Sequence, residues 1–120
     1  MELKLVNEGG LKVVEGEPDQ SYLSSVQDTD RVIEACMEGG TSLALLYADN
    51  LTAGFFDLSS GEAGSILQKL RNYRIRLAVV CPTGGEGFST RFGEMVAEER
   101  RGRYFGLFAT RHEARDWLGP

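Results

Sequence analysis

Residues 55–81 read FFDLSSGEAGSILQKLRNYRIRLAVVC, and this stretch decides the fold. A turn of small and polar residues leads into residues 61–73, where apolar side chains recur every three or four positions, as in an amphipathic helix. The run at 77–81 is apolar throughout, which is typical of a parallel strand covered by helices on both faces of a sheet. The sequence therefore predicts a helix followed by a buried strand. The positions expected to face inward on that helix are Ala63, Ile66, Leu67, Leu70 and Tyr73.

The same alternation of helix and strand extends outward in both directions. Strand-like runs on either side of Gly9-Gly10 predict an opening hairpin, and Gly39-Gly40 predicts the end of a first helix. We therefore expect an α/β fold with a mixed, largely parallel sheet and the order β-β-α-β-α-β-α-β-α, in a single domain over residues 1–120. Beyond the stretch quoted above, the expected segments are strands at 3–6, 11–14, 42–47 and 104–109, a helix at 25–38 with Val32, Ile33, Cys36 and Met37 at inward spacing, a loop at 49–58, and helices that begin after Ser89 and Thr110.

Length and composition restrict the class of protein. A chain of 120 residues with 42% hydrophobic residues supplies one complete core but not two. Its longest apolar runs are far shorter than the roughly 18 residues of a spanning helix, and it begins without a basic and apolar leader. Cys36 and Cys81 lack metal-type spacing and are interpreted as reduced thiols. We expect a cytoplasmic protein with no membrane insertion, no metal and no cofactor.

Charge is distributed unevenly along the chain. Through Ser60 there are 3 basic and 11 acidic side chains, a net charge of −8, whereas from Gly61 onward there are 10 basic and 7 acidic, a net charge of +3. In one interpretation the two halves interleave in the sheet and their charges pair; in the other, Arg100, Arg101 and Arg103 form a surface for an acidic partner. The overall charge of −5 argues against nucleic acid as a partner.

The candidate site lies where the predicted parallel strands end. Ligands usually meet such sheets at the carboxyl ends of the strands, where Asn50, the loop at 84–87 and Thr110 are expected. Ser59 and Glu62 have the spacing of a capping box, which leaves the Ser60 hydroxyl available as a switch or an anion contact at a helix start. The candidate binding surface comprises Asp57, Ser59, Gly61, Gln68, Lys69 and Asn72.

Enzymatic activity stays open at this point, although the pattern favours a non-catalytic role. A small enzyme or metabolite-binding protein would use the edge at 49–61 as a pocket, with Asp57 as base and Ser60 or Cys81 as nucleophile. The lone histidine, His112, falls in the first turn of the last predicted helix, where exposure is the default. The partner classes that fit a non-catalytic module are a second protein, another copy of this chain, and a small anionic ligand.

The central phrase resembles a known family. The chain is similar to the bacterial family called domain of unknown function 4180, whose members carry a phrase like F-F-D-L-x-T-G-x-A-G-x-x-L-Q-K-x-x-N-Y. The resemblance covers nearly the whole chain but implies no activity, and the chain departs from the pattern at Ser60 and Arg100. The matching residues are Asp57, Gly61, Ala63, Gly64, Leu67, Gln68, Lys69, Asn72 and Tyr73, with the strand at 77–80.

A more distant similarity is to STAS domains, the type found in anti-sigma-factor antagonists. They share the expected order of elements and carry D-S-S-G before the corresponding helix, with the second serine phosphorylated in regulatory members. Here Asp57-Leu58-Ser59-Ser60-Gly61 has one residue more between the acid and the Ser-Gly pair. The resemblance implies a STAS-like regulatory module in which Ser60 is the switch residue and Asp57 the loop acid.

Overall fold

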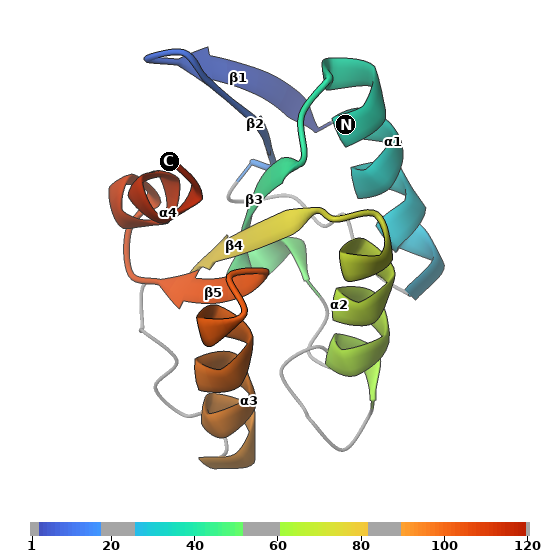
Figure 1. Ribbon diagram of the computed structural model, residues 1–120, viewed down its shortest axis with the longest axis vertical. Coiled ribbons are helices and arrows are strands. Elements are labelled where there is room, and N and C mark those ends of the chain that lie inside the picture. The colour runs from blue at the N-terminus through green and yellow to red at the C-terminus, as the bar shows by residue number, and fades with distance from the viewer. Residues whose placement is uncertain (1–2, 18–25, 52–60, 82–89, 120) are drawn as a thin grey trace.

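The computed structural model describes residues 3–17, 26–51, 61–81 and 90–119, which form a five-stranded sheet and its covering helices (Figure 1). The α/β class and the predicted order β-β-α-β-α-β-α-β-α are confirmed, and two short 3-10 helices are added. The elements are β1 (Lys4–Glu8), β2 (Leu11–Glu15), η1 (Val26–Asp28), α1 (Thr29–Gly39), β3 (Leu43–Tyr47), η2 (Ala48–Asn50), α2 (Glu62–Asn72), β4 (Arg76–Val80), α3 (Thr90–Arg101), β5 (Phe105–Phe108) and α4 (Arg111–Leu118).

The strands lie in the order in which they occur along the chain, β1-β2-β3-β4-β5. β1 is antiparallel to β2, and each later strand is parallel to its predecessor. When parallel strands are added one after another at the same edge, right-handed connections place every intervening helix on one face. Accordingly, α1, α2 and α3 contribute to one hydrophobic cluster, and α4 packs on the opposite face of the sheet (Figure 1).

Alternation along the strands divides the core between these two faces. The first cluster takes Val14, Leu46, Val79 and Phe105, together with buried residues of α1 and α2. The second takes the alternate strand positions, such as Val13 and Leu45, and packs them against Ala114 and Leu118 of α4. Burial on both sides explains why β3 and β4 are apolar without a polar alternation.

Glycine makes the opening hairpin tight. Glu8 pairs with Leu11, so Gly9 and Gly10 form the whole turn, with φ angles of 60° and 81°. Two consecutive positive φ angles are those of a type I′ turn, which glycine adopts at no steric cost. The predicted hairpin is confirmed.

Two side chains expected to face inward are instead exposed. Met37 lies in the last turn of α1, which ends at Gly39, and is 67% exposed although Ile33, one turn earlier, is buried. Tyr73 is 51% exposed because α2 ends at Asn72 and Tyr73 is already the C-terminal capping residue, outside the helical stripe. The prediction that these two residues face inward was therefore wrong, whereas Ala63, Ile66, Leu67 and Leu70 are buried as expected.

Candidate functional site

Helix α2 carries the part of the predicted binding surface that the structure describes. Because α2 follows β3, it begins near the edge where the parallel strands end. Gly61 is its N-terminal capping residue, exposed and with φ of 76°, and it has no side chain with which to cap the helix. The first backbone hydrogen bond of the helix runs from the Ser65 amide to the Gly61 carbonyl, 3.1 Å.

An exposed stripe without charge runs along the outer side of α2. Its members are three or four positions apart, so they lie on the same side of the helix. A Cβ atom added at Gly61 or Gly64 would have no atom within 4 Å, which shows that this side is open. We call this feature the α2 stripe; it consists of Gly61, Gly64, Ser65, Gln68 and Asn72.

Lys69 lies at the border of the stripe and is less available than the sequence suggested. Its Nζ atom lies 2.8 Å from a carboxylate oxygen of Asp30, and its side chain is only 30% exposed. The ammonium group thus links α2 to α1. Of the predicted binding residues, Gly61, Gln68 and Asn72 are freely exposed, while Lys69 forms an ion pair within the fold.

Several candidates lie outside the described residues. They are the switch candidate Ser60, its neighbours Asp57 and Ser59, the aromatic pair Phe55 and Phe56, and the glycine-rich loop at 84–87. The capping box predicted for Ser59 and Glu62 is wrong, because α2 begins at Glu62 with Gly61 as its capping residue. The other roles stay predictions from the sequence.

Asn50 connects two chain segments at the carboxyl edge of the sheet. Its side chain is fully buried, its Oδ1 accepts a hydrogen bond of 2.7 Å from the Tyr47 amide, and its Nδ2 donates one of 2.6 Å to the Glu17 carbonyl. A buried amide that satisfies backbone groups on both segments fixes how the chain leaves β2 and β3. Asn50 therefore lies at the predicted edge but acts as a structural clamp.

A network of arginines and glutamates joins α4 to the opening hairpin. Arg111 donates from Nε and an Nη to the two carboxylate oxygens of Glu15, at 2.8 and 2.9 Å, and from an Nη to Glu8 at 3.0 Å. Arg115 donates to the same Glu15 carboxylate and, at 2.9 Å, to the Leu11 carbonyl. Glu15 and Arg115 are only 6% and 9% exposed. Because both charges are buried, loss of either partner would leave the other without compensation.

The network changes the titration of its members. The hydrogen bond from Arg111, with help from the charges of Arg111 and Arg115, lowers the pKa of Glu8 below its usual value despite partial desolvation. Hydrogen bonds to Glu15 and Glu8 raise the pKa of Arg111, so this guanidinium stays charged. Burial and the charge of Glu15 raise the pKa of Tyr47, although Arg111 opposes that effect.

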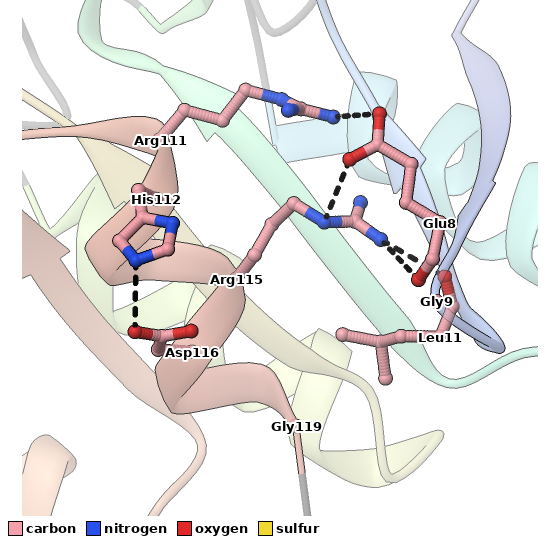
Figure 2. Close-up of a pocket in the computed structure, with 8 residues that line it drawn as sticks. All are labelled: Glu8, Gly9, Leu11, Arg111, His112, Arg115, Asp116 and Gly119. Carbon is pink, nitrogen blue, oxygen red and sulfur yellow. Dashed lines mark hydrogen bonds and ion pairs between the residues drawn. The ribbon is translucent and has the colours of Figure 1, made fainter.

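An open hollow of about 550 Å³ lies between α4 and the hairpin turn (Figure 2). Figure 2 shows Arg111 and Arg115 directed toward Glu8, while His112 pairs with Asp116 of its own helix. The His112 Nε2 atom lies 3.4 Å from the Asp116 carboxylate, and both side chains are exposed. Each cation that borders the hollow is thus engaged by a carboxylate of the fold, which leaves little positive charge for an anionic ligand.

The two thiols belong to the core. Cys36 and Cys81 are both buried, and burial raises the pKa of Cys36 to about 11. A thiol that stays protonated is a poor nucleophile, so Cys36 serves as packing. In the part of the chain that the structure describes, no three metal-binding side chains gather at one point. The described helices include none with the length and apolarity to span a bilayer.

The hairpin–α4 network is the feature that sequence reasoning missed. Glu15 and Arg115 are 100 positions apart, and an acid at the end of a strand is usually expected to be solvated. Two signals were nevertheless present. Glu15 continues the inward alternation of Leu11 and Val13, and Arg111 and Arg115 are spaced by one helical turn ahead of a buried leucine.

Comparison with known proteins gives one result. Neither the curated proteins nor the solved structures include a match to the chain. A family model matches residues 8–118, from the last residue of β1 to the end of α4, and so includes strands β2 to β5 and the four described α-helices. By this match the chain belongs to the family described as Domain of unknown function (DUF4180).

Proposed function

We propose that the chain is a non-catalytic binding module whose contact surface is the α2 stripe together with the segment at 49–61 that leads into it. The observation that carries this proposal is the lack of charge on the stripe. In a chain with 26% charged residues, five exposed positions of one helix are uncharged, and the exposed Arg71 lies at their border, three positions after Gln68. Uncharged side chains cost less to desolvate than charged ones, and these still offer hydrogen bonds to a partner.

The two glycines of the stripe favour a protein partner. Without a Cβ atom at Gly61 and Gly64, another chain can approach the α2 backbone closely, and no atom of the described residues lies within 4 Å of a Cβ atom built at either position. The long side chains of Gln68 and Asn72 lie further along the same side, where they can donate and accept hydrogen bonds. The residues tied into ion pairs, such as Lys69, mark the border of this surface.

A regulatory switch at Ser60 is the finer part of the proposal. Ser60 directly precedes Gly61, the capping residue of α2, and aligned backbone amides at a helix start stabilise a phosphate group. The similarity to anti-sigma-factor antagonists supports the same position. Phosphorylation there would add negative charge beside a neutral surface and so lower the affinity for the partner.

Affinity purification from the native cytosol tests the surface. The tagged chain is compared with Gln68→Arg/Asn72→Arg, and with Asn7→Arg/Ala97→Arg as a control that adds the same charge at exposed positions of β1 and α3. We expect a stoichiometric species to accompany the parent and the control but to be lost from the α2 variant. Retention of that species by the α2 variant, or the lack of any such species with the parent, would contradict the proposal.

The switch is tested separately by mass spectrometry of the protein after treatment with a cytosolic kinase fraction. Phosphate on Ser60, together with loss of the copurifying species from Ser60→Asp, is the expected result. A Ser60 that stays unmodified removes the switch but not the binding surface. Light scattering of the purified chain shows whether the partner is a second copy.

A further inference from the structure

Arginines converge at the amino edge of the sheet, opposite the edge at which α2 begins. The connections α2–β4 and α3–β5 are short, so the last turns of α2 and α3 meet where β4 and β5 start, and α4 also ends there. Two adjoining hollows of about 480 and 330 Å³ lie at this edge. We call their basic side chains the amino-edge cluster; its members are Arg71, Arg74, Arg76, Arg101 and Arg103.

The two hollows share a wall, which makes the cluster continuous. Gly102 and Tyr104 line both of them. Arg71 and Arg101 border the larger hollow, and the remaining three arginines border the smaller. Among the described residues that line either hollow, Glu98 is the one acid.

Part of the cluster is explained by the fold itself. Arg76 donates from Nε to the Arg103 carbonyl at 2.7 Å and from its Nη atoms to the Trp117 and Leu118 carbonyls at 2.8 and 3.2 Å. Its guanidinium also lies 4.4 Å from the centre of the Trp117 ring. These contacts satisfy carbonyls at the end of α4, where a cation complements the helix dipole.

Three members have no such role. Arg74, Arg101 and Arg103 are exposed, and no ion pair joins any of them to a carboxylate of the described residues. Arg74 and Arg103 have φ angles of 58° and 67°, a conformation that costs a residue with a Cβ atom roughly 1 kcal/mol. Burial and the charge of Arg103 lower the pKa of Arg76. The fold thus holds the positive charge of Arg103 close to Arg76. It also places Arg74 and Arg103 at backbone positions where glycine would fit better.

We propose that the amino-edge cluster docks an acidic segment of a partner protein, with carboxylates in both hollows. A guanidinium presents paired N–H donors that match the two oxygens of a carboxylate. Two adjoining basic hollows fit a segment with acidic side chains spaced along an extended chain. This proposal does not rest on the proposed function, because the cluster contains no residue of the α2 stripe.

The shape and charge of the molecule favour this occupant over other anions. A small ligand is normally buried on most of its surface, whereas exposed arginines form the walls of these hollows. A long polyanion such as nucleic acid would meet the rest of a protein whose net charge is −5. A short acidic segment needs contact only with the cluster.

Fluorescence polarisation of the whole protein tests the proposal. The probe is a labelled peptide in which glutamate and glycine alternate, with a glutamine–glycine peptide as the neutral reference, at low ionic strength. We expect the acidic peptide to bind about tenfold more tightly than the neutral one, and Arg74→Asn/Arg103→Asn to weaken its binding about fivefold or more. Asparagine tolerates positive φ, so this variant is expected to fold. Arg101→Gln provides a second variant within a regular helix.

The control removes equal charge elsewhere. Lys12→Asn/Arg31→Asn alters exposed positions on β2 and α1, and we expect it to weaken binding less than twofold. Equal losses in the two double variants, equal binding of the two peptides, or no binding of the acidic peptide at about millimolar concentration would overturn the proposal. So would tighter binding of pyrophosphate, single-stranded DNA or anionic vesicles than of the acidic peptide.

Discussion

The two arginine-rich regions of the molecule differ in what surrounds the same side chain. Between α4 and the hairpin, Arg111 and Arg115 meet Glu8 and Glu15, so their charges are neutralised inside the fold. At the amino edge, five arginines share two hollows with Glu98 as the one acid among the described lining residues. The first region is built for stability. In the second, Arg74, Arg101 and Arg103 are exposed without an ion pair to a described carboxylate, and two of them hold a positive φ angle at some cost in stability.

The uneven distribution of charge along the chain can now be compared with the ion pairs of the fold. The acidic first half and the basic second half do pair across the sheet, since Glu8 and Glu15 bind arginines of α4, and Asp30 binds Lys69. Pairing nevertheless uses only some of the basic residues. The pairing interpretation therefore describes part of the molecule, and the interpretation of an acidic-partner surface stays a prediction.

The largest expected effect comes from removing the buried carboxylate. Glu15→Ala leaves Arg115 buried without its main partner and deprives Arg111 of two hydrogen bonds. An uncompensated buried charge costs about 3–5 kcal/mol, and we expect the free energy of unfolding in urea to fall by that amount. Glu34→Ala, at an exposed position of α1, is the control. A loss below about 1 kcal/mol would show that the network does not stabilise the fold.

Next in size is the loss of Arg76, an amino-edge arginine with a clear structural role. Arg76→Ala removes three hydrogen bonds to carbonyls and the contact with the Trp117 ring. We expect the free energy of unfolding to fall by about 2–3 kcal/mol. Arg101→Ala, in the same cluster but without these bonds, is expected to change it by less than about 0.5 kcal/mol. Similar losses in both variants would remove the distinction between structural and available arginines.

The sequence predicted most of the fold because its signals are local. Glycines at the hairpin turn, the three- and four-residue spacing of α2 and the apolar runs of β3 and β4 each act within a few residues. The predicted binding surface included Gly61, Gln68 and Asn72, and these three residues are exposed. The features missed are those that depend on distant segments or on an element's end: the burial of Glu15, the ion pair of Lys69 with Asp30, and the exposure of Tyr73.

The arginine cluster lies between these cases. The neighbouring residues Arg101 and Arg103 were visible as a basic run, and an acidic partner was one of the two interpretations of that run. Arg74 and Arg76 follow a different helix and come to the same edge only because β4 and β5 are parallel neighbours. A candidate surface of this kind therefore requires the topology as well as the composition.

A smaller effect of opposite sign, an increase in the free energy of unfolding, is expected at the strained backbone position of Arg103. Arg103→Gly relieves a positive φ angle of 67° and removes a charge close to Arg76, while the carbonyl that Arg76 binds stays in place. The gain is partly offset by the greater entropy of glycine in the unfolded chain, so we expect a net stabilisation of about 0.5 kcal/mol. Urea unfolding measures it. Destabilisation would mean that the Arg103 side chain supports the fold, contrary to the comparison between the two regions.

The smallest expected effect is a pH dependence of stability that comes from Glu8, the exposed carboxylate of the hairpin–α4 network. Because Arg111 lowers the pKa of Glu8 below the usual 4.5, the carboxylate stabilises the fold above about pH 4.5, and this contribution is lost as the pH falls through the lowered value. The urea midpoints of the parent and of Glu8→Gln should therefore differ at neutral pH and converge in acid; Glu34→Gln, at an exposed position of α1, is measured as the control. A difference that persists below the lowered pKa would mean that Glu8 acts through packing. Convergence would instead place Glu8 with Glu15 as a charge partner of α4, since only the ionised carboxylate accepts the hydrogen bond of 3.0 Å from Arg111 at full strength.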